Sequence, residues 1–193
     1  KTYMKIFDCI TFFQENLITN IRLEILNEYV DYFVICESTF DHVGNKKNLN
    51  FKLSNNQFKD KIIYLILDKP FPKSNNAWQN QALQREFIFN GLGSAEPLDL
   101  ILFSDPDEIP NPKLLKNLSL QKDYGIFLQK LFYYKFNLLC DRIKWYGTRM
   151  IKKKDLINFE WLRQIKPKKY PFYRIDTFFK KDRYMDVNII QNG

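Results

Sequence analysis

The chain has 193 residues, a length typical of one domain with a substantial buried core. Hydrophobic residues make up 45% of it and aromatic residues 17%, which excludes the apolar-poor composition of an intrinsically disordered protein. The formal net charge of +8 favours phosphates, nucleic acid and anionic membrane surfaces as partners, but does not choose among them.

The first part of the chain alternates between strand-like and helix-like segments. Four short apolar runs predict buried strands, at 4–9, 32–37, 61–67 and 99–104. Apolar residues at helical spacing predict helices over 17–29 and 77–93, and the polar, Asn-rich segment 38–60 predicts a long loop. The order β-α-β-β-α-β indicates a mostly parallel sheet covered by helices.

After Pro112 the pattern changes to longer, more amphipathic strands, predicted at 125–137 and 147–153, followed by irregular basic sequence. No repeat or low-complexity linker divides the chain. We therefore predict an α/β fold with a mixed, mostly parallel sheet flanked by helices, in a single domain over 1–193. Its nucleotide-binding half is expected at 1–110 and its acceptor-side half at 111–193.

Basic residues interleaved with aromatic residues gather between 151 and 183. This pattern is typical of a nucleic-acid surface and also of the solvated face of a Lys-rich domain. No nucleic-acid-binding motif accompanies it, so we expect no nucleic-acid partner. A basic module that binds nucleic acid or an anionic surface without catalysis is kept as the alternative function.

The three cysteines, Cys9, Cys36 and Cys140, are widely spaced and lie in apolar contexts. They predict buried thiols rather than a disulfide framework, which is typical of a reducing compartment. No apolar run approaches the ~18–20 residues of a membrane span. We expect a cytoplasmic protein, for which peripheral membrane contact through the basic C-terminal region is an option.

The segment "LILFSDPDEIPNP" at 100–112 places Asp105, Asp107 and Glu108 directly after a predicted buried strand. In open α/β sheets, ligands bind beyond the carboxyl ends of the strands. Two carboxylates one residue apart can converge on a hard cation such as Mg²⁺ or Mn²⁺, whose other ligands are often substrate phosphates. The pattern predicts a metal–diphosphate site. The alternative is a solvated turn in which Asp105 caps a helix that begins near Pro112.

Several segments occur in the order and spacing of glycosyltransferase family 17, which the chain resembles. They are "IFDCITFFQE" (6–15), "IRLEIL" (21–26), "DYFVICESTFDHVG" (31–44), "KIIYLILD" (61–68), Trp78 with "QR" (84–85), "DLILFSDPDEIP" (99–110) and "WYGT" (145–148). The family includes β-1,4-mannosyl-glycoprotein 4-β-N-acetylglucosaminyltransferases. The resemblance implies a GT-A-type (Rossmann-like) fold, a UDP-sugar donor such as UDP-GlcNAc, a glycan or glycolipid acceptor, a Mn²⁺ or Mg²⁺ ion held through the D-x-D, and transfer with inversion.

The resemblance also implies roles for the three acid residues. Asp107 is expected to be the main metal ligand, and Asp105 to bind the metal through water or to contact the ribose. Glu108 is expected to orient these ligands, with general base toward the acceptor hydroxyl as the alternative.

The loop after the first strand is where the family holds the nucleotide. Phe12 or Phe13 is expected to cover the uracil, with core packing as the alternative for either ring. Glu15 is expected to accept ribose hydroxyls, to cap the following helix, or both. Glu37 and Ser38 end the second strand at the same edge and are expected to bind donor, with a capping or ion-pair role as the alternative for Glu37.

On the second helix, Gln84 and Arg85 match the family's "QR". Arg85 is expected to reach the diphosphate, or to pair with Glu37 or Asp105 and orient them. The loop residue His42 is assigned no catalytic role.

The acceptor side is less defined by the sequence. Trp145, Tyr146 and the aromatic residues of 132–136 are expected to form a sugar-stacking platform or to pack in the core. The basic surface that includes Lys168 and Lys169 favours an acidic or phosphorylated glycan or a lipid-linked acceptor.

Two departures from the family pattern are expected to matter. Gln79 and Asn80 stand where the family tends to carry Arg-Glu, so an ion pair made there is absent. The family continues past an Asn-Gly like that at 192–193, so we expect the acceptor-side half to be truncated at its C-terminus. A catalytic base in that continuation would lie outside this sequence.

Overall fold

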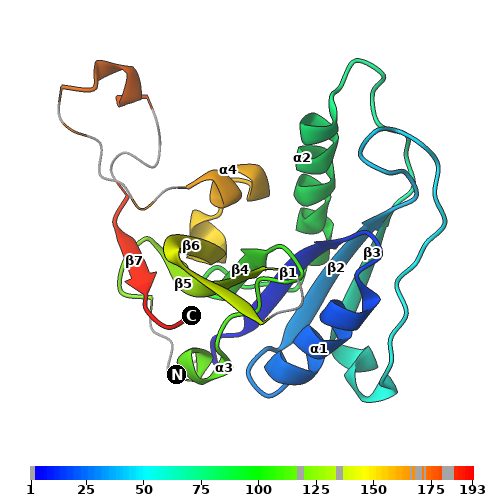
Figure 1. Cartoon of the computed structure of the whole chain (residues 1–193), viewed down its shortest axis with the longest axis horizontal. Coiled ribbons are helices and arrows are strands. Elements are labelled where there is room, and N and C mark those ends of the chain that lie inside the picture. The colour runs from blue at the N-terminus through cyan, green and yellow to red at the C-terminus, as the bar shows by residue number, and fades with distance from the viewer. Residues whose placement is uncertain are drawn as a thin grey trace.

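The computed structural model describes residues 3–116, 120–133, 137–165, 167, 171, 173–179 and 185–193. In these residues a seven-stranded sheet has the order β3-β2-β1-β4-β6-β5-β7 (Figure 1). Four of its six strand pairs are parallel, and β6 is antiparallel to both of its neighbours. The predicted mixed, mostly parallel α/β sheet is confirmed.

The parallel part of the sheet contains β1 (Ile6–Phe12), β2 (Tyr32–Ser38), β3 (Ile62–Leu67) and β4 (Leu100–Ser104). Helix α1 (Asn16–Leu26) connects β1 to β2. Helix α2 (Ala77–Phe87) precedes β4 and continues as the 3₁₀ helix η2 (Ile88–Gly91). Both α-helices are shorter at their C-terminal ends than predicted. The segment predicted as one long loop contains the 3₁₀ helix η1 (Asn56–Lys61).

The second half of the chain adds α3 (Pro112–Leu115), β5 (Tyr124–Tyr133), β6 (Leu138–Lys152), α4 (Phe159–Gln164) and β7 (Val187–Ile190). Two short 3₁₀ helices, η3 (Lys153–Asp155) and η4 (Ile175–Thr177), also lie in the described part of this half. The prediction that the segment after the last strand is irregular was wrong for α4 and β7. Helix α4 begins where the side chain of Asn158 accepts a hydrogen bond from the Trp161 amide at 2.6 Å.

The helices lie on both faces of the sheet, α1 and α3 on one and α2 and α4 on the other (Figure 1). Strand β1 is buried along its whole length because it faces both layers: Ile6 and Ile10 pack toward α1, and Phe7 and Cys9 pack toward α2 and α4. This two-sided burial explains the continuous apolar run in the sequence. Of the helices in the described ranges, none has the length and apolarity needed to cross a bilayer.

The cysteines are free thiols, as predicted. Cys9 and Cys36 lie on β1 and β2 and are fully buried, whereas Cys140 on β6 is only partly buried. The expectation of a buried thiol is therefore confirmed for two of the three.

The order of the strands creates a crevice beside β1. The chain passes from β1 to β2 and β3 on one side, and β4 then pairs with the other side of β1. The carboxyl ends of β1 and β4 therefore lie side by side where the strand order reverses, and such switch points are where ligands bind in α/β sheets.

Candidate active site

The acidic turn 105–108 follows β4 at this switch point and is closed by its own residues. The Glu108 amide donates to the Asp105 carbonyl at 3.1 Å, and the Asp105 amide donates to Glu108 Oε2 at 3.2 Å. Helix α3 is capped by Asn111, whose side chain accepts from the Lys113 amide at 3.1 Å. The alternative interpretation of Asp105 as the cap of that helix was wrong.

A fully buried arginine, Arg22 on α1, holds the backbone of this turn. Its Nε and Nη2 each donate to Asp8 on β1 at 2.7 Å, and Nη2 also donates to Ser104 Oγ at 2.7 Å. Its Nη1 donates to three carbonyl groups of the 105–108 turn at distances of 3.1 to 3.4 Å. Arg22 therefore fixes the backbone that carries the acid residues, and Asp8 compensates its charge.

Sequence reasoning gave no role to Arg22 or Asp8. The available signal was that each charge interrupts an otherwise apolar segment, Asp8 within the first strand and Arg22 on the buried face of the first helix. Lone charges of opposite sign in two buried elements indicate a buried ion pair, because an unpaired charge in the core is too costly.

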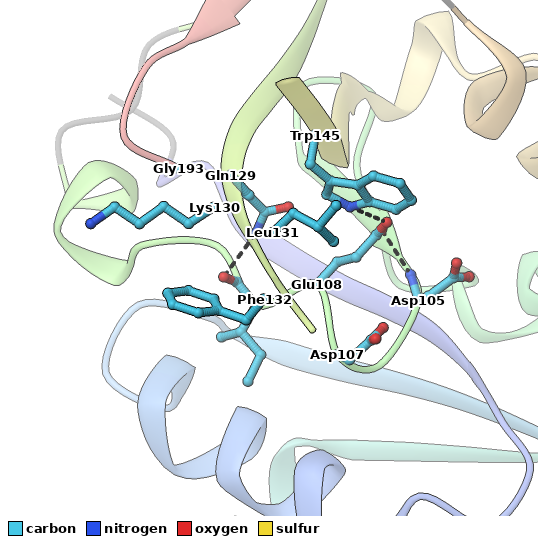
Figure 2. Close-up of a pocket in the computed structure, with 10 residues that line it drawn as sticks. Asp105, Asp107, Glu108, Gln129, Lys130, Leu131, Phe132, Trp145 and Gly193 are labelled. Atoms are coloured by element: carbon cyan, nitrogen blue, oxygen red, sulfur yellow. Dashed lines mark hydrogen bonds between the residues drawn. The ribbon is translucent and has the colours of Figure 1, made fainter. Parts of the chain in front are cut away.

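The carboxylate of Glu108 is buried and held from two sides. Arg163 on α4 donates to both of its oxygens at 3.0 Å. Trp145 Nε1 donates to Oε1 at 3.0 Å (Figure 2). Arg163 also donates to Asp105 Oδ2 at 2.7 Å. Burial lowers the pKa of Arg163, but the charges of Glu108 and Asp105 outweigh it, and the pKa is raised above its ordinary value.

Asp107 differs from its neighbours in the turn. It is exposed, and its carboxylate makes no hydrogen bond or ion pair with any residue in the described ranges. In those ranges, no group of three or more His, Cys, Asp or Glu side chains forms a metal cage. Hard cations in phosphate-handling sites usually take only one or two carboxylates from the protein and complete their shell with water and phosphate. The pair Asp105 and Asp107 fits that pattern.

The switch-point cavity, defined here by Thr11, Phe12, Phe13, Glu15, His42, Gln81, Gln84 and 105–107, has a volume of about 250 Å³. Phe12 is 1% exposed and packs edge-on against Phe51 with ring centroids 5.4 Å apart, so it belongs to the core. Phe13 is 37% exposed and is the aromatic ring available to a ligand. Glu15 makes no side-chain cap on α1; its Oε2 accepts from the amides of Phe13 and Gln14, both at 3.0 Å.

Gln84 links three parts of this cavity. Its Nε2 donates to the carbonyls of Phe12 at 3.2 Å and Cys36 at 2.9 Å, and its Oε1 lies 2.7 Å from His42 Nε2. His42, for which no role was predicted, thus lines the cavity. Asn80 donates to the His42 carbonyl at 2.9 Å, so this departure from the family pattern holds the loop in place.

Glu37 and Ser38 line none of the cavities described here. Glu37 is fully buried, and it accepts from Lys47 Nζ at 2.6 Å, Tyr64 Oη at 2.7 Å and the amides of residues 50 and 51 at 2.7 and 3.0 Å. Ser38 Oγ accepts from the Phe40 amide at 3.0 Å. The geometry favours the ion-pair alternative for Glu37, which ties the loop 46–51 to the sheet.

Arg85 lies on α2 and is 6% exposed. Its Nη1 donates to Glu160 on α4 at 2.7 Å. It pairs with neither Glu37 nor Asp105, so the orienting role proposed from the sequence goes to a different carboxylate.

The Trp145 cavity lies on the other side of the acidic turn and has a volume of about 410 Å³ (Figure 2). It is lined by Asp105, Asp107, Glu108, Ile109, 129–132, Trp145 and Gly193. Trp145 and Phe132 contribute aromatic surface, as predicted for a platform, whereas Tyr146 faces a third cavity. Tyr134, Lys135 and Phe136 lie outside the described residues.

The segment "WYGT" at 145–148 acts on the acidic turn through its neighbours. Gln129 donates to the Ile109 carbonyl and accepts from the Thr148 amide, both at 2.8 Å, and Thr148 Oγ1 donates to the Glu108 carbonyl at 2.8 Å. A Cβ on Gly147 would come within 1.7 Å of Gln129 Oε1. The glycine is therefore required for Gln129 to pass between β6 and the turn.

Sequence comparison relates the chain to known proteins. The model of glycosyltransferase family 17 matches residues 1–166. A β-1,4-mannosyl-glycoprotein 4-β-N-acetylglucosaminyltransferase of Homo sapiens is 32% identical in an alignment of 102 positions that covers 47% of this chain and 19% of that protein. The Rattus norvegicus protein of the same name gives the same values.

A solved structure of a glycosyltransferase involved in the glycosylation of the major capsid of PBCV-1 covers 97% of this chain and 81% of its own, at 13% identity and a TM-score of 0.41. The Homo sapiens and Rattus norvegicus relatives are glycosyltransferases by name. The family match covers most of the sequence, and the chain belongs to glycosyltransferase family 17. It matches only about a fifth of the length of its curated relatives.

Proposed function

We propose that this protein is a metal-dependent inverting glycosyltransferase that transfers a sugar from a UDP-sugar to a glycan or glycolipid acceptor. The sugar that we propose is GlcNAc. The observation that carries the proposal is the position of the acidic turn. Asp105 and Asp107 line both the switch-point cavity and the Trp145 cavity. A donor and an acceptor bound in these two cavities would meet at the two aspartates.

The donor nucleotide is assigned to the switch-point cavity. Phe13 offers an exposed ring for stacking on uracil. Glu15 Oε1 accepts no hydrogen bond from any residue in the described ranges and is assigned to the ribose hydroxyls. Gln84 and His42 line the cavity next to the carboxyl ends of β1 and β2.

Asp107, with Asp105 beside it, would hold a Mn²⁺ or Mg²⁺ ion. The ion, when bound, neutralises the negative charge that develops on the departing diphosphate. Arg163 keeps Asp105 in place through Oδ2, and Glu108 keeps Arg163 in place through both of its oxygens. Glu108 therefore acts as a positioning residue in this proposal.

The acceptor is assigned to the Trp145 cavity, where Trp145 and Phe132 provide apolar surface for a sugar ring. The basic residues Lys168 and Lys169, which favoured an acidic or lipid-linked acceptor, lie outside the described residues. A cytoplasmic location with peripheral membrane contact stays a prediction. The family match favours the transferase over a non-catalytic basic module.

The test is calorimetric titration of UDP with and without MnCl₂. We expect UDP to bind in a metal-dependent way and Asp107→Asn to weaken that binding by at least about tenfold. Asp60→Asn, a change of the same chemistry at an exposed aspartate of η1, is the matched control and should bind UDP normally. Equal UDP binding with and without metal, or by Asp107→Asn, would refute the proposal.

A further inference from the structure

A third cavity, the α2–α4 cavity, shares Gln81 and Asp105 with the switch-point cavity and has a volume of about 660 Å³. It is lined by residues of α2, α4 and the segment 143–149 of β6. Four cationic side chains, Arg85, Lys144, Arg149 and Arg163, line it together with only two carboxylates, those of Asp105 and Glu160. Neither the proposed donor site nor the proposed metal site assigns a ligand to this cavity.

Two of the four cations are already neutralised by protein carboxylates. Arg163 is shared between Asp105 and Glu108, and Arg85 donates to Glu160. The buried Nε of Arg85 has no hydrogen-bond partner in the described part of the chain. These pairs consume the two carboxylates of the cavity.

Arg149 is a buried cation that takes part in neither of these ion pairs. It is 7% exposed, and no carboxylate in the described ranges lies within ion-pair distance of it. Only its Nη1 donates, to the carbonyls of Tyr146 and Gly147, and its buried Nε has no partner among the described residues. Burial, followed by the charge of Arg163, lowers its pKa to about 10, so it is still a cation at neutral pH.

A buried guanidinium without a counterion is costly, and its planar set of donors matches the two oxygens of a carboxylate or phosphate. Lys144, which is exposed, adds a second positive charge at the same cavity. Trp78 is 78% exposed and lines the cavity with Trp145 and Tyr146, so aromatic faces suited to a sugar ring surround the cations.

We propose that the α2–α4 cavity is an anion subsite, in which Arg149 and Lys144 bind the carboxylate or phosphate group of an acidic saccharide. The assignment of that saccharide to the acceptor rests on the proposed transferase function, because the cavity reaches the acidic turn at Asp105. The anion site itself does not depend on the donor or on a metal.

The subsite is tested by titrating inorganic phosphate, glucuronate, glucose 6-phosphate and neutral glucose into metal-free protein, with calorimetry and the Nε–H NMR signals of arginine as readouts. We expect at least one anion to bind and glucose to bind at least about tenfold more weakly. Glucuronate and glucose 6-phosphate distinguish a carboxylate from a phosphate as the recognised group. Absence of binding by every anion would overturn the proposal.

Variants locate the site. Arg149→Met and Lys144→Met should each weaken anion binding, Arg149→Met by about tenfold or more. Arg142→Met, on the exposed part of the same strand, is the control and should bind normally. Lys144 is exposed, so its substitution keeps the test valid if Arg149→Met fails to fold.

Competition separates this proposal from the donor site. UDP with MnCl₂ should leave anion binding unchanged, whereas displacement of phosphate by UDP would assign Arg149 to the donor diphosphate and refute the acceptor subsite. Since the anion titrations contain no donor and no metal, their failure leaves the result of the UDP titration intact.

Discussion

Arg163 on α4 donates to both carboxylate oxygens of Glu108, each at 3.0 Å, across 55 positions of sequence. The same arginine reaches Asp105, while Trp145 donates to Glu108 from β6. Glu108 is therefore fully engaged by protein groups, and Asp107 is the acid residue of the turn that is left for a ligand. This division of work could not be read from the D-P-D-E sequence alone.

Substitution of Glu108 distinguishes positioning from catalysis. Glu108→Gln keeps an acceptor for Trp145 but removes the charge that faces Arg163, so we expect slower hydrolysis of UDP-GlcNAc, by about tenfold or more. The acidic limb of the pH–rate profile should remain, because no titrating base has been removed. Loss of that limb in Glu108→Gln would instead assign Glu108 as the general base.

Removal of the buried guanidinium below the turn should destabilise the fold. Arg22→Met leaves Asp8 buried without its partner, for which we expect a loss of about 3–5 kcal/mol in the free energy of unfolding. The double variant Asp8→Leu/Arg22→Met should recover part of that loss, since it leaves no unpaired charge. Urea unfolding measures both. A loss under about 1 kcal/mol for Arg22→Met would contradict the buried pair.

The glycine of "WYGT" is required by space. Gly147→Ala places a methyl group against Gln129, so we expect destabilisation of about 1–3 kcal/mol and weaker metal-dependent UDP binding as the acidic turn shifts. Gly93→Ala is the control, because nothing lies within 4 Å of its Cβ. Thermal unfolding of both variants is the measurement, and equal melting temperatures would contradict the steric argument.

The two neighbouring phenylalanines should respond differently to truncation. Phe13→Ala should raise the Kd for UDP by about tenfold, the value of one aromatic–base stack, with little change in stability. Phe12→Ala should cost about 3–5 kcal/mol because that ring is buried in the core. Phe13→Tyr should restore UDP binding. Normal binding by Phe13→Ala would place the uracil elsewhere.

The buried thiols predict a loss of stability at alkaline pH. Burial raises the pKa of Cys36 from 9.0 to about 12, and also raises that of Cys9. Below pH 9 the thiols keep their protons in both states, and above it only the unfolded chain releases them, so stability should fall from about pH 9 upward. Cys36→Ala should reduce this loss of stability. Equal free energies of unfolding at pH 8 and pH 10, measured by urea unfolding, would contradict the prediction.

Local sequence was sufficient to predict the parallel strands and the position of Asp105 and Asp107 directly after β4, because an apolar run and the residues that end it are neighbours in the chain. It was insufficient for Glu37, whose four partners come from the loop 46–51 and from β3 and meet only in the folded protein. The role of Arg163 could not be predicted for the same reason. It lay in a segment judged basic and irregular, although Asn158 marked the start of a helix.

The start of β6 was missed for a related reason. It begins at Leu138 rather than 147, and its first residues are mostly exposed on both faces. Their sequence therefore lacks the alternation that a half-buried strand shows. Pairing with β5, rather than burial, defines this part of the strand.

Arg22 holds the acidic turn by donating to the backbone carbonyl groups of the turn and not to the side chains of the turn. The shape of the loop is consequently independent of the residue chosen at position 107. Under the proposed function, a designer can exchange that side chain for a different ligand, and so aim for another ion or another leaving group, without removing the hydrogen bonds from Arg22. Scaffold and chemistry are separable at this point of the molecule.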